Sequence, residues 1–491
     1  MAANYNKSFI KDYGKLLLDI DELSSLIKDQ NKIIRTLNDT VNNLSKLLTE
    51  KDDLIKKLIL DNERLKNNND KDSSNSSKPS SKNGFKKVNN SREKTNRKQG
   101  GQKGHKGYTS KTSKVEKLIE SGEAKHTVIE VNKNRSNNSL PYKIRYVQDI
   151  EISTVIKEYH YYPDSKGLYN IPKEQNNIVT YGSNVKATGM LLVHRVPSSM
   201  DQAVTFLNAI TNGNFEITKS SLNNWTCELS HKLDPLIKEI RNGLLNSYYV
   251  NVDESPINVN GENQQLHNYS NGKYTLQYIH ENKTKEAIAE LDFLTKYMGI
   301  LIHDHNKVQY NYGIKHGECN AHILRYLKGV TDFTKHKWAK EMTEHLKDIL
   351  HQKHLLLEQK ITEFNEGTLK AFSEKYDKIL KEASKEYQSD YETNSYRDEE
   401  RKLITRLEEY KANHLLFMYD FKIPFTNNRA EADIRPAKRK LNVGIFRKQN
   451  GARCYLRIRS FISTFLKNNR DIFEEIKNAF DNKTISLNLG G

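Results

Sequence analysis

The chain has 491 residues, with 79 Lys and Arg against 62 Asp and Glu, which gives a formal net charge of +17. This length predicts about three or four domains, because single domains usually span about 100–200 residues. No apolar run approaches the roughly 18–20 residues of a membrane span, and the N-terminal residues contain no apolar signal segment. Three cysteines are too few for a disulfide framework. These features exclude integral membrane and conventional secreted proteins, and they predict a basic cytoplasmic protein that binds nucleic acid.

Residues 1–68 carry a heptad repeat of apolar side chains. One row is mostly β-branched and the other is mostly leucine, the preference of a parallel two-stranded coiled coil at its two core positions. The first row consists of Ile20, Ile27, Ile34, Val41, Leu48, Ile55 and Asn62, and the second of Leu16, Leu23, Gln30, Leu37, Leu44, Lys51, Leu58 and Leu65. A single amphipathic helix packed on its own domain is the alternative. The repeat favours self-association or pairing with a partner subunit.

Residues 69–114 predict a flexible basic linker. The stretch is rich in Ser, Asn and Lys and has no hydrophobic period. From Lys78 to Lys114 it has twelve Lys or Arg and one acid, Glu93. Its segment RKQGGQKGHKG interleaves cations with glycine and could follow a phosphate backbone through Arg97, Lys98, Lys103 and Lys106. A solvated linker without DNA contact is the alternative.

The next two segments predict a small accessory region. Residues 115–185 look β-rich, with stretches such as HTVIEV and YKIRYVQDIEIS. Residues 186–245 read as helix, turn, helix, with Lys219 to Trp225 at the start of the second helix. Such a unit could be a DNA-reading helix-turn-helix or a helical hairpin packed on the following domain.

Residues 246–332 and 421–491 predict an α/β core, which residues 333–420 interrupt with a charged, all-helical insertion that contains no proline. Two strands of the core end in aspartate, Asp253 after SYYVNV and Asp304 after GILIH. Mg²⁺ prefers hard oxygen ligands, and a carboxylate at a strand end is rigidly placed but open to solvent. An ordinary turn aspartate is the alternative at each position.

The segment TNNRAEADIRPAKRK offers a third carboxylate. Asn427 or Asn428 could cap a helix, and Glu431, Arg435 and Arg439 then share one helix face. That face would supply a metal ligand and cations for phosphate. A salt-bridged surface helix is the alternative, and Pro436 is expected to kink or end the helix near Arg435.

These motifs resemble the transposases of insertion-sequence family sixty-six, the TnpC-type DDE subunit. The resemblance rests on the zipper-like helix with its RKQGGQKGHKG segment, the VDES strand, HDHNKVQYNYG with GECNAHILRYLKG, and NNRAEADIRPAKRKLNVGIFRKQNGA. It implies an RNase H-like core with Asp253, Asp304 and Glu431 as catalytic metal ligands for Mg²⁺ or Mn²⁺. It also implies DNA cleavage and strand transfer at element ends, and small accessory proteins encoded by the same element.

Other residues of these motifs have weaker assignments. Cys319, His322 and Arg325 form a C-x2-H-x2-R pattern and are predicted structural or phosphate contacts. Arg435, Arg439 and Lys440 are predicted to steady phosphates. Relatives carry paired cysteines in the segment that corresponds to 115–185, but this chain has none there. We therefore expect a degenerate zinc-finger-like segment and no bound zinc.

The sequence as a whole predicts a DDE transposase, nucleoid-associated in the cytoplasm, whose partners are terminal inverted repeats and target DNA. A homodimer or higher oligomer through the coiled coil is expected, and a membrane partner is not. The alternatives are a non-catalytic architectural DNA-binding protein and an RNase H-like nuclease without strand transfer. Three carboxylates in strand, strand, helix order argue against the first of these.

Overall fold

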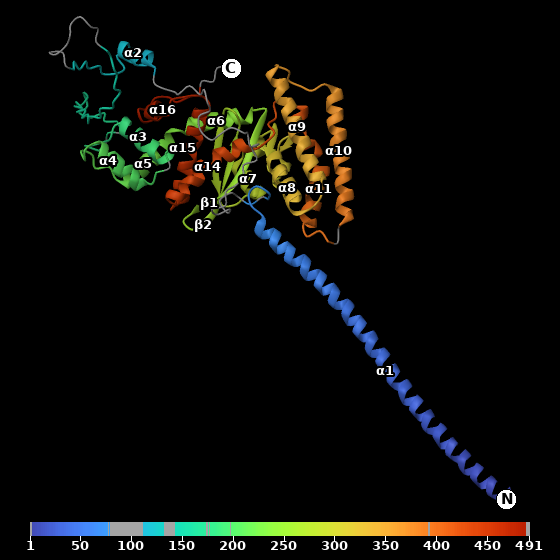
Figure 1. Ribbon diagram of the computed structural model, residues 1–491. Helices are drawn as coiled ribbons and strands as arrows, with labels where there is room; N and C mark the ends of the chain where they lie inside the picture. The colour runs from blue at the N-terminus through green and yellow to red at the C-terminus, as the bar shows by residue number, and fades with distance from the viewer. Residues whose placement is uncertain are drawn as a thin grey trace. The chain divides into compact units, whose positions relative to one another are not determined.

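The computed structural model divides the chain into two compact units (Figure 1). One unit comprises Met1–Val88 and His322–Phe421, and the other comprises Asn89–Ala321 and Lys422–Gly491. The structure describes residues 2–76, 78, 111–131, 143–172, 175, 177–196, 198–390 and 393–487. In that part of the chain, no helix is long and apolar enough to cross a membrane.

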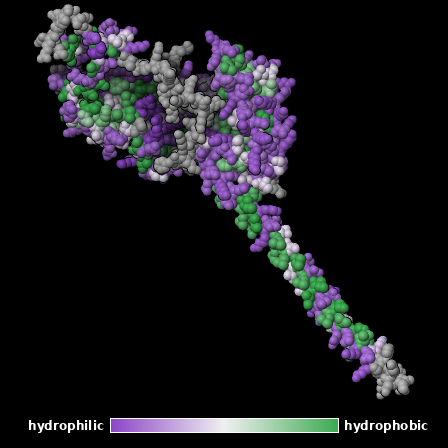
Figure 2. Space-filling view, in the orientation of Figure 1, coloured by the Kyte–Doolittle hydropathy of each residue, from purple (hydrophilic) through white to green (hydrophobic). Residues whose placement is uncertain are grey.

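The first unit begins with one long helix, α1 (Ala2–Asp70). The apolar side chains of both heptad rows are exposed along it, for example Ile34 at 53% and Val41 at 58%. Figure 2 shows apolar side chains distributed along this helix. A helix therefore forms where the heptad repeat is, whereas its pairing with a second helix remains a prediction.

The remainder of the first unit is a helical bundle. Trp338, Tyr376 and Phe417 are fully buried among its helices, and buried Glu400 accepts hydrogen bonds from Trp338 Nε1 at 2.7 Å and Asn394 Nδ2 at 2.8 Å. The bundle contains α8 (Asn320–Phe333), α9 (Trp338–Glu358), α10 (Glu366–Ser389), α11 (Arg397–Glu409), α12 (Lys411–His414) and α13 (Leu416–Tyr419). Residues 333–420 are thus helical where the sequence predicts a helical insertion.

The chain that leaves α1 docks on this bundle. Lys71 Nζ binds Glu399 Oε1 at 2.6 Å, and Asn75 Nδ2 donates to Asp332 Oδ2 at 3.3 Å. Asn75 is 5% exposed because Gly329 on α8 leaves room for its backbone: a Cβ on that glycine would lie 2.5 Å from Asn75 O. The prediction of a flexible linker that starts at residue 69 is therefore wrong for residues 69–76. Residues 71–76 are held by hydrogen bonds to a distant part of the chain, which composition cannot predict.

The second unit contains a mixed five-stranded sheet. The strand order is β3-β2-β1-β4-β5, with β1, β2 and β3 antiparallel and β4 and β5 parallel to β1. The strands are β1 (Tyr249–Val259), β2 (Glu262–Ser270), β3 (Thr275–His280), β4 (Ile300–His303) and β5 (Lys315–Glu318). This sheet, with the helices around it, confirms a mixed α/β fold.

Helices cover the sheet and its free edge. The helix α14 crosses β1 and β2, and α15 packs along the edge strand β3 and against α5. The described helices of this unit are α2 (Thr112–Glu120), α3 (Ser183–His194), α4 (Met200–Ile210), α5 (Lys219–Lys232), α6 (Asp234–Leu245), α7 (Lys285–Leu291), α14 (Asn428–Val443), α15 (Gln449–Lys467) and α16 (Ile472–Phe480). Hydroxyl groups of α15 protect the edge of β3: Thr464 accepts from Thr275 N at 3.0 Å and Ser460 from Gln277 N at 2.9 Å.

The two faces of the sheet differ in chemistry because side chains alternate along each strand. On one face, Val250, Val252 and Tyr269 enter the main hydrophobic core with residues of α3, α5, α6, α15 and α16. On the other face, under α14, Asn251, Asp253 and Asn268 form a polar layer at the centre of the sheet. The polar face therefore lies between β1 and α14, the elements that carry Asp253 and Glu431.

The described part of residues 115–185 does not form the predicted strands. It consists of α2 followed by extended segments without strand pairing, and apolar side chains such as Val147, Ile150 and Ile156 are more than 80% exposed. Alternating apolar residues make a strand only where another strand supplies hydrogen bonds and a core covers the apolar face. Neither is present for these described residues.

The segment 186–245 forms four helices, of which α4 and α5 are the predicted pair. Leu222, Trp225 and Leu229 of α5 are buried in the core of the second unit. The helical-hairpin alternative is thus what the packing supports. Lys219, Asn223 and Asn224 remain exposed on the outer face of α5, so a contact with DNA stays a prediction.

Candidate active site

Asp253 and Asp304 are brought together by the parallel pairing of β1 and β4. Asn251 pairs with Ile302, and each aspartate follows its paired residue by two positions. Asp253 lies in the middle of β1 and Asp304 directly follows the last residue of β4, and this pairing places the two residues side by side on one face of the sheet. The prediction that a strand ends at Asp253 is wrong, because β1 continues to Val259 and pairs with β2 beyond Asp253, whereas β4 does end just before Asp304. The sequence also could not show that the two strands are neighbours.

Glu431 reaches the same place from α14. It lies in the first turn of the helix, beside buried Ala430 and Ile434, and its side chain is 24% exposed. The helix continues through Pro436 to Val443, so the expected break near Arg435 does not occur. Pro436 has no N–H group to donate to the carbonyl of Ala432. Ala432 is exposed, so water can form a hydrogen bond with this carbonyl instead.

The pKa of Asp253 reflects the proximity of the three acids. Burial, then the charge of Asp304 and that of Glu431, raises the pKa of Asp253 to about 7. The Lys438 ammonium group on α14 opposes this rise. The three carboxylates do not bring one oxygen each within 4.8 Å of the others, so the group is open. Gathered carboxylates with too little positive charge around them are a fitting environment for a divalent cation.

Glu254, the neighbour of Asp253, points to the opposite face of the sheet. Its carboxylate accepts from Asn306 Nδ2 at 2.9 Å and from Gln309 Nε2 at 3.4 Å, and it lies 3.5 Å from His267 Nδ1. Adjacent strand residues point to opposite faces, which is why Glu254 does not join Asp253.

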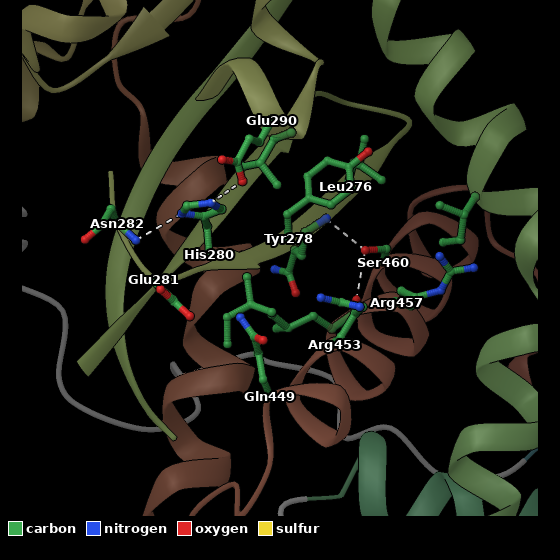
Figure 3. Close-up of a pocket in the computed structure, with 15 residues that line it drawn as sticks. Leu276, Tyr278, His280, Glu281, Asn282, Glu290, Gln449, Arg453, Arg457 and Ser460 are labelled. Carbon is green, nitrogen blue, oxygen red and sulfur yellow. Dashed lines mark hydrogen bonds and ion pairs between the residues drawn. The ribbon is translucent and has the colours of Figure 1, made fainter. Parts of the chain in front are cut away.

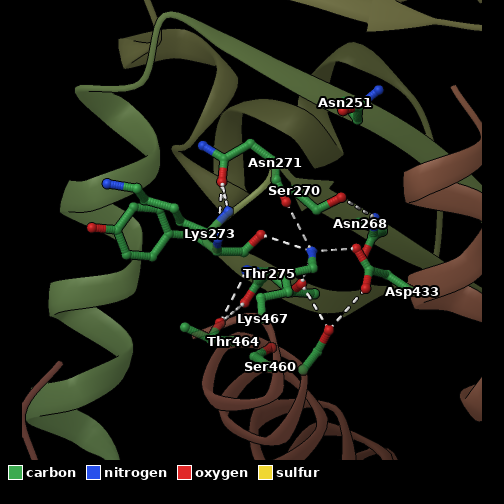
Figure 4. A network of polar contacts seen from close by, with 12 residues as sticks. Asn251, Asn268, Ser270, Asn271, Lys273, Thr275, Asp433, Ser460, Thr464 and Lys467 are labelled. Carbon is green, nitrogen blue, oxygen red and sulfur yellow. Dashed lines mark hydrogen bonds and ion pairs between the residues drawn. The ribbon is translucent and has the colours of Figure 1, made fainter. Parts of the chain in front are cut away.

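Asp433, the other acid of α14, is part of a buried polar network (Figure 4). Its carboxylate accepts from Lys467 Nζ at 2.7 Å and from Ser463 Oγ at 2.8 Å. Gln277 Nε2 donates to the Asp433 carbonyl at 2.9 Å and to Asn268 Oδ1 at 3.1 Å. Asp433 therefore ties α14 to α15 and the sheet, and Glu431 is the carboxylate of α14 that faces Asp253.

The predicted phosphate-binding cations of α14 are in different environments. Arg435 and Arg439 are exposed, and Arg435 Nη2 lies 3.5 Å from Glu431 Oε2. Lys440 is 8% exposed, donates to Gly444 O at 3.3 Å and lies over the ring of Phe446. It points into the fold, so the assignment of Lys440 to phosphate binding is wrong. Lys438, which the sequence analysis did not single out, is the exposed lysine close enough to act on Asp253.

Cys319 has a structural contact. It is fully buried after β5, and its Sγ accepts a hydrogen bond from Asn427 N at 3.1 Å. His322 and Arg325 lie on α8 in the first unit and are half-buried there, so their roles remain predictions. The cations Arg97, Lys98, Lys103 and Lys106 lie outside the described residues.

Asn427 is a polar residue of this site, but the sequence predicted only a helix-capping role for it. It is fully buried, and its side-chain amide contacts Asp304 Oδ1, Val252 O and Asn251. The signal in the sequence was the pair of asparagines before Glu431, which was interpreted only as a helix cap.

A cavity of about 590 Å³ lies elsewhere in the same unit, between β3 and α15 (Figure 3). Arg453, Arg457 and Gln449 line it on the helix side, and His280, bound to Glu290 at 2.9 Å, lines it on the other. None of the three acids lines this cavity. The candidate active site is instead the polar face of the sheet at Asp253 and Asp304.

Comparison with known proteins identifies the family. A family profile described as "Transposase IS66 family" matches residues 206–454, about half of the chain. No curated protein matches. No solved structure matches either. The matched range includes β1, β4 and α14 with Asp253, Asp304 and Glu431. The chain therefore belongs to the IS66 family of transposases.

Proposed function

We propose that this protein is a DDE transposase whose RNase H-like core cleaves the ends of a mobile element and joins them to target DNA. The observation that carries the proposal is the convergence of Asp253, Asp304 and Glu431 in a chain of the IS66 family. The sheet order, three antiparallel strands followed by two parallel ones, supports the RNase H-like assignment.

The donor set fits Mg²⁺ or Mn²⁺, because it consists of carboxylate oxygens, the pKa of Asp253 is raised, and no thiolate or imidazole is needed. Asp253, Asp304 and Glu431 would hold the ions. When bound, such ions lower the pKa of the attacking hydroxyl group and neutralise the charge that develops on phosphate.

The protein's own side chains bind and orient the DNA. Lys438 favours the ionised form of Asp253. Exposed Arg435 and Arg439 lie on the same helix as Glu431 and would contact phosphate oxygens. Hydrolysis first frees a 3′-hydroxyl at the element end, and that hydroxyl then attacks a phosphodiester of the target.

Other parts of the chain would bring the DNA and the subunits together. Arg97, Lys98, Lys103 and Lys106 would contact phosphates without sequence preference. The exposed heptad rows of α1 would pair two copies, and accessory proteins of the element could dock on the same subunit. The complex would act at the nucleoid.

The test uses purified full-length protein and a plasmid that carries the inverted repeats flanking the gene. Wild-type protein with Mg²⁺ should nick the repeats and give joined products with a second plasmid. Glu431→Gln, Asp253→Asn and Asp304→Asn should bind the repeat DNA normally and give neither product. Nicking without joining would favour an RNase H-like nuclease, and DNA binding without nicking would favour an architectural protein.

A further inference from the structure

Asn427 stands where a helix cap is expected, yet it does not cap the helix. It precedes α14 as the N-cap residue, but its side chain makes no capping hydrogen bond. Its backbone, with φ −88° and ψ 15°, is outside the extended region usual for an N-cap. A capping bond from asparagine typically contributes about 1 kcal/mol, so the side chain forgoes a favourable local contact.

The amide instead connects the middle of β1, which carries Asp253, with Asp304 at the end of β4. Its Nδ2 donates to Val252 O at 2.7 Å and to Asp304 Oδ1 at 3.3 Å, and its Oδ1 accepts from Asn251 Nδ2 at 2.9 Å. Both neighbours of Nδ2 are pure acceptors, so the orientation of the amide is fixed by chemistry. Val252 immediately precedes Asp253, so one amide group contacts the strands of both aspartates.

The backbone of Asn427 extends this connection to the third acid. Its N–H donates to Cys319 Sγ at 3.1 Å, and its carbonyl accepts from Ala430 N at 3.1 Å and more weakly from Glu431 N at 3.4 Å. Asn320 N, next to Cys319, also donates to Phe425 O at 3.1 Å. These bonds fix the start of α14 to the end of β5, one turn before Glu431.

The burial of the group makes these bonds specific. Asn427 is 0% exposed, and both polar atoms of its side chain have partners inside the protein. A side chain that cannot donate at position 427 would leave Val252 O without its amide donor and would leave Asp304 without this contact. The adjacent residue, Asn428, is exposed and makes no such contact.

We propose that Asn427 is a positioning residue: its buried amide holds Asp304 and the middle of β1 at the start of α14, and so sets the arrangement of the three acids for a divalent cation. This inference rests on the proposed function. Groups that orient the ligands of a metal commonly change its affinity by about 10–100-fold when they are removed.

The experiment measures Mn²⁺ binding to the full-length protein without DNA, by electron paramagnetic resonance of the free ion. Asn427→Ala should weaken Mn²⁺ binding by about tenfold or more, whereas the neighbouring control Asn428→Ala should stay within about twofold. The Mg²⁺ concentration for half-maximal cleavage should rise in parallel for Asn427→Ala, and high Mn²⁺ should restore part of the rate. Wild-type Mn²⁺ affinity in folded Asn427→Ala would overturn the proposal.

Asn251→Ala is a milder variant, useful if Asn427→Ala does not fold, as judged by urea unfolding. It removes only the hydrogen bond that steadies the Asn427 oxygen, so Mn²⁺ binding should weaken by about threefold, less than for Asn427→Ala. If folded Asn251→Ala binds Mn²⁺ like the wild type, the proposal is wrong.

Asp253→Asn separates the inference from the proposed function. If Asp253→Asn binds Mn²⁺ like the wild type, the carboxylate site itself is wrong. If Asp253→Asn loses binding and Asn427→Ala keeps it, the carboxylate site stands and only the positioning role fails.

Discussion

At the scale of single residues, the two acids of α14 lie in different environments and have different contacts. Glu431 lies near Asp253 at a half-exposed position, and Asp433, two residues later, is buried against Lys467 and Ser463. Two positions correspond to about 200° around a helix, so the two carboxylates face opposite directions. Asp433 therefore has a structural contact, whereas Glu431 is close enough to raise the pKa of Asp253.

The first prediction concerns this pair. Asp433→Asn should lower the free energy of unfolding by about 3 kcal/mol, because it leaves the buried Lys467 ammonium without its counter-charge. Urea unfolding monitored by circular dichroism measures the loss. Glu431→Gln, the control, should unfold within about 0.5 kcal/mol of the wild type, as expected for a half-exposed site.

A double variant tests the cause of that instability. Asp433→Asn combined with Lys467→Met removes both charges and should recover part of the lost stability. An Asp433→Asn protein that is as stable as the wild type but inactive in cleavage would reverse the assignment of the two acids.

The second prediction follows from the pKa of Asp253, raised to about 7 by burial and by Asp304 and Glu431. An acid whose pKa is higher in the folded than in the unfolded state binds more protons when folded. It therefore stabilises the folded state at low pH, and this contribution is lost as pH rises from about 4 to about 7. In metal-free protein, Asp253→Asn should thus be most stabilising at about pH 8, and this advantage over the wild type should shrink steadily as the pH falls toward 5.

Thermal unfolding in a chelator across pH 5–8 measures this effect. Only the difference between wild type and Asp253→Asn is informative, because buried His194 and His303, whose pKa values burial lowers to about 3, have the opposite pH dependence. Added Mn²⁺ should raise the melting temperature of the wild type at pH 8 and leave that of Asp253→Asn almost unchanged. A pH-independent difference would mean that Asp253 is ionised throughout.

At the scale of elements, features that depend on neighbouring residues were predicted from the sequence, and features that depend on distant residues were not. The strands that carry Asp253 and precede Asp304 are local patterns, and they were predicted, but the predicted strand end at Asp253 is wrong because β1 continues to Val259. The side-by-side pairing of β1 with β4 is a contact between distant segments, which one sequence does not reveal. The alternating residues in 115–185 carry a strand pattern without the partner strand that would complete it.

Two further misses have the same origin. Composition alone predicted a linker from residue 69, although Gly329 and Asp332, more than 250 positions away, provide its docking site. Asparagine before a helix predicts a cap, and only the acceptors Val252 O and Asp304 Oδ1, distant in sequence, explain why the Asn427 side chain makes no cap.

The third prediction tests the docking of residues 71–76. Gly329→Ala would place a Cβ 2.5 Å from Asn75 O and 2.7 Å from Tyr396 Oη, so the segment must move away. Hydrogen exchange in peptides that cover residues 67–76 should accelerate by about tenfold or more, whereas exchange in α9 and α10 should stay slow.

A matched glycine supplies the control. Gly367 in α10 has no atom nearer than 3.4 Å to an added Cβ, so Gly367→Ala should be neutral or stabilising by up to about 1 kcal/mol, the usual gain from alanine in a helix. If Gly329→Ala behaves in the same way, the packing of the segment on α8 is wrong.

At the scale of the whole molecule, the charged residues of the candidate active site and the exposed apolar rows are found in different parts of the chain. The second unit carries the acids, and exposed cations of α14 lie beside Glu431. The long helix α1 instead exposes apolar side chains throughout, including Leu23, Ile34, Leu37, Val41 and Leu44 at more than half of their surface. Such a stripe is unfavourable in water for an isolated helix of this length, and a second helix would cover it.

The last prediction is therefore that the full-length protein self-associates through α1. Ile34→Lys with Val41→Lys places two charges in the predicted buried row, where their desolvation is unfavourable, and should convert the dimer to a monomer in sedimentation at about 10 µM. The control, Thr36→Lys with Asn43→Lys, adds the same number of lysines outside both rows and should leave the dimer intact. A wild-type protein that sediments as a monomer would instead assign the apolar rows of α1 to a different partner chain. If the control also dissociates, the added charge and not the location of the seam is responsible.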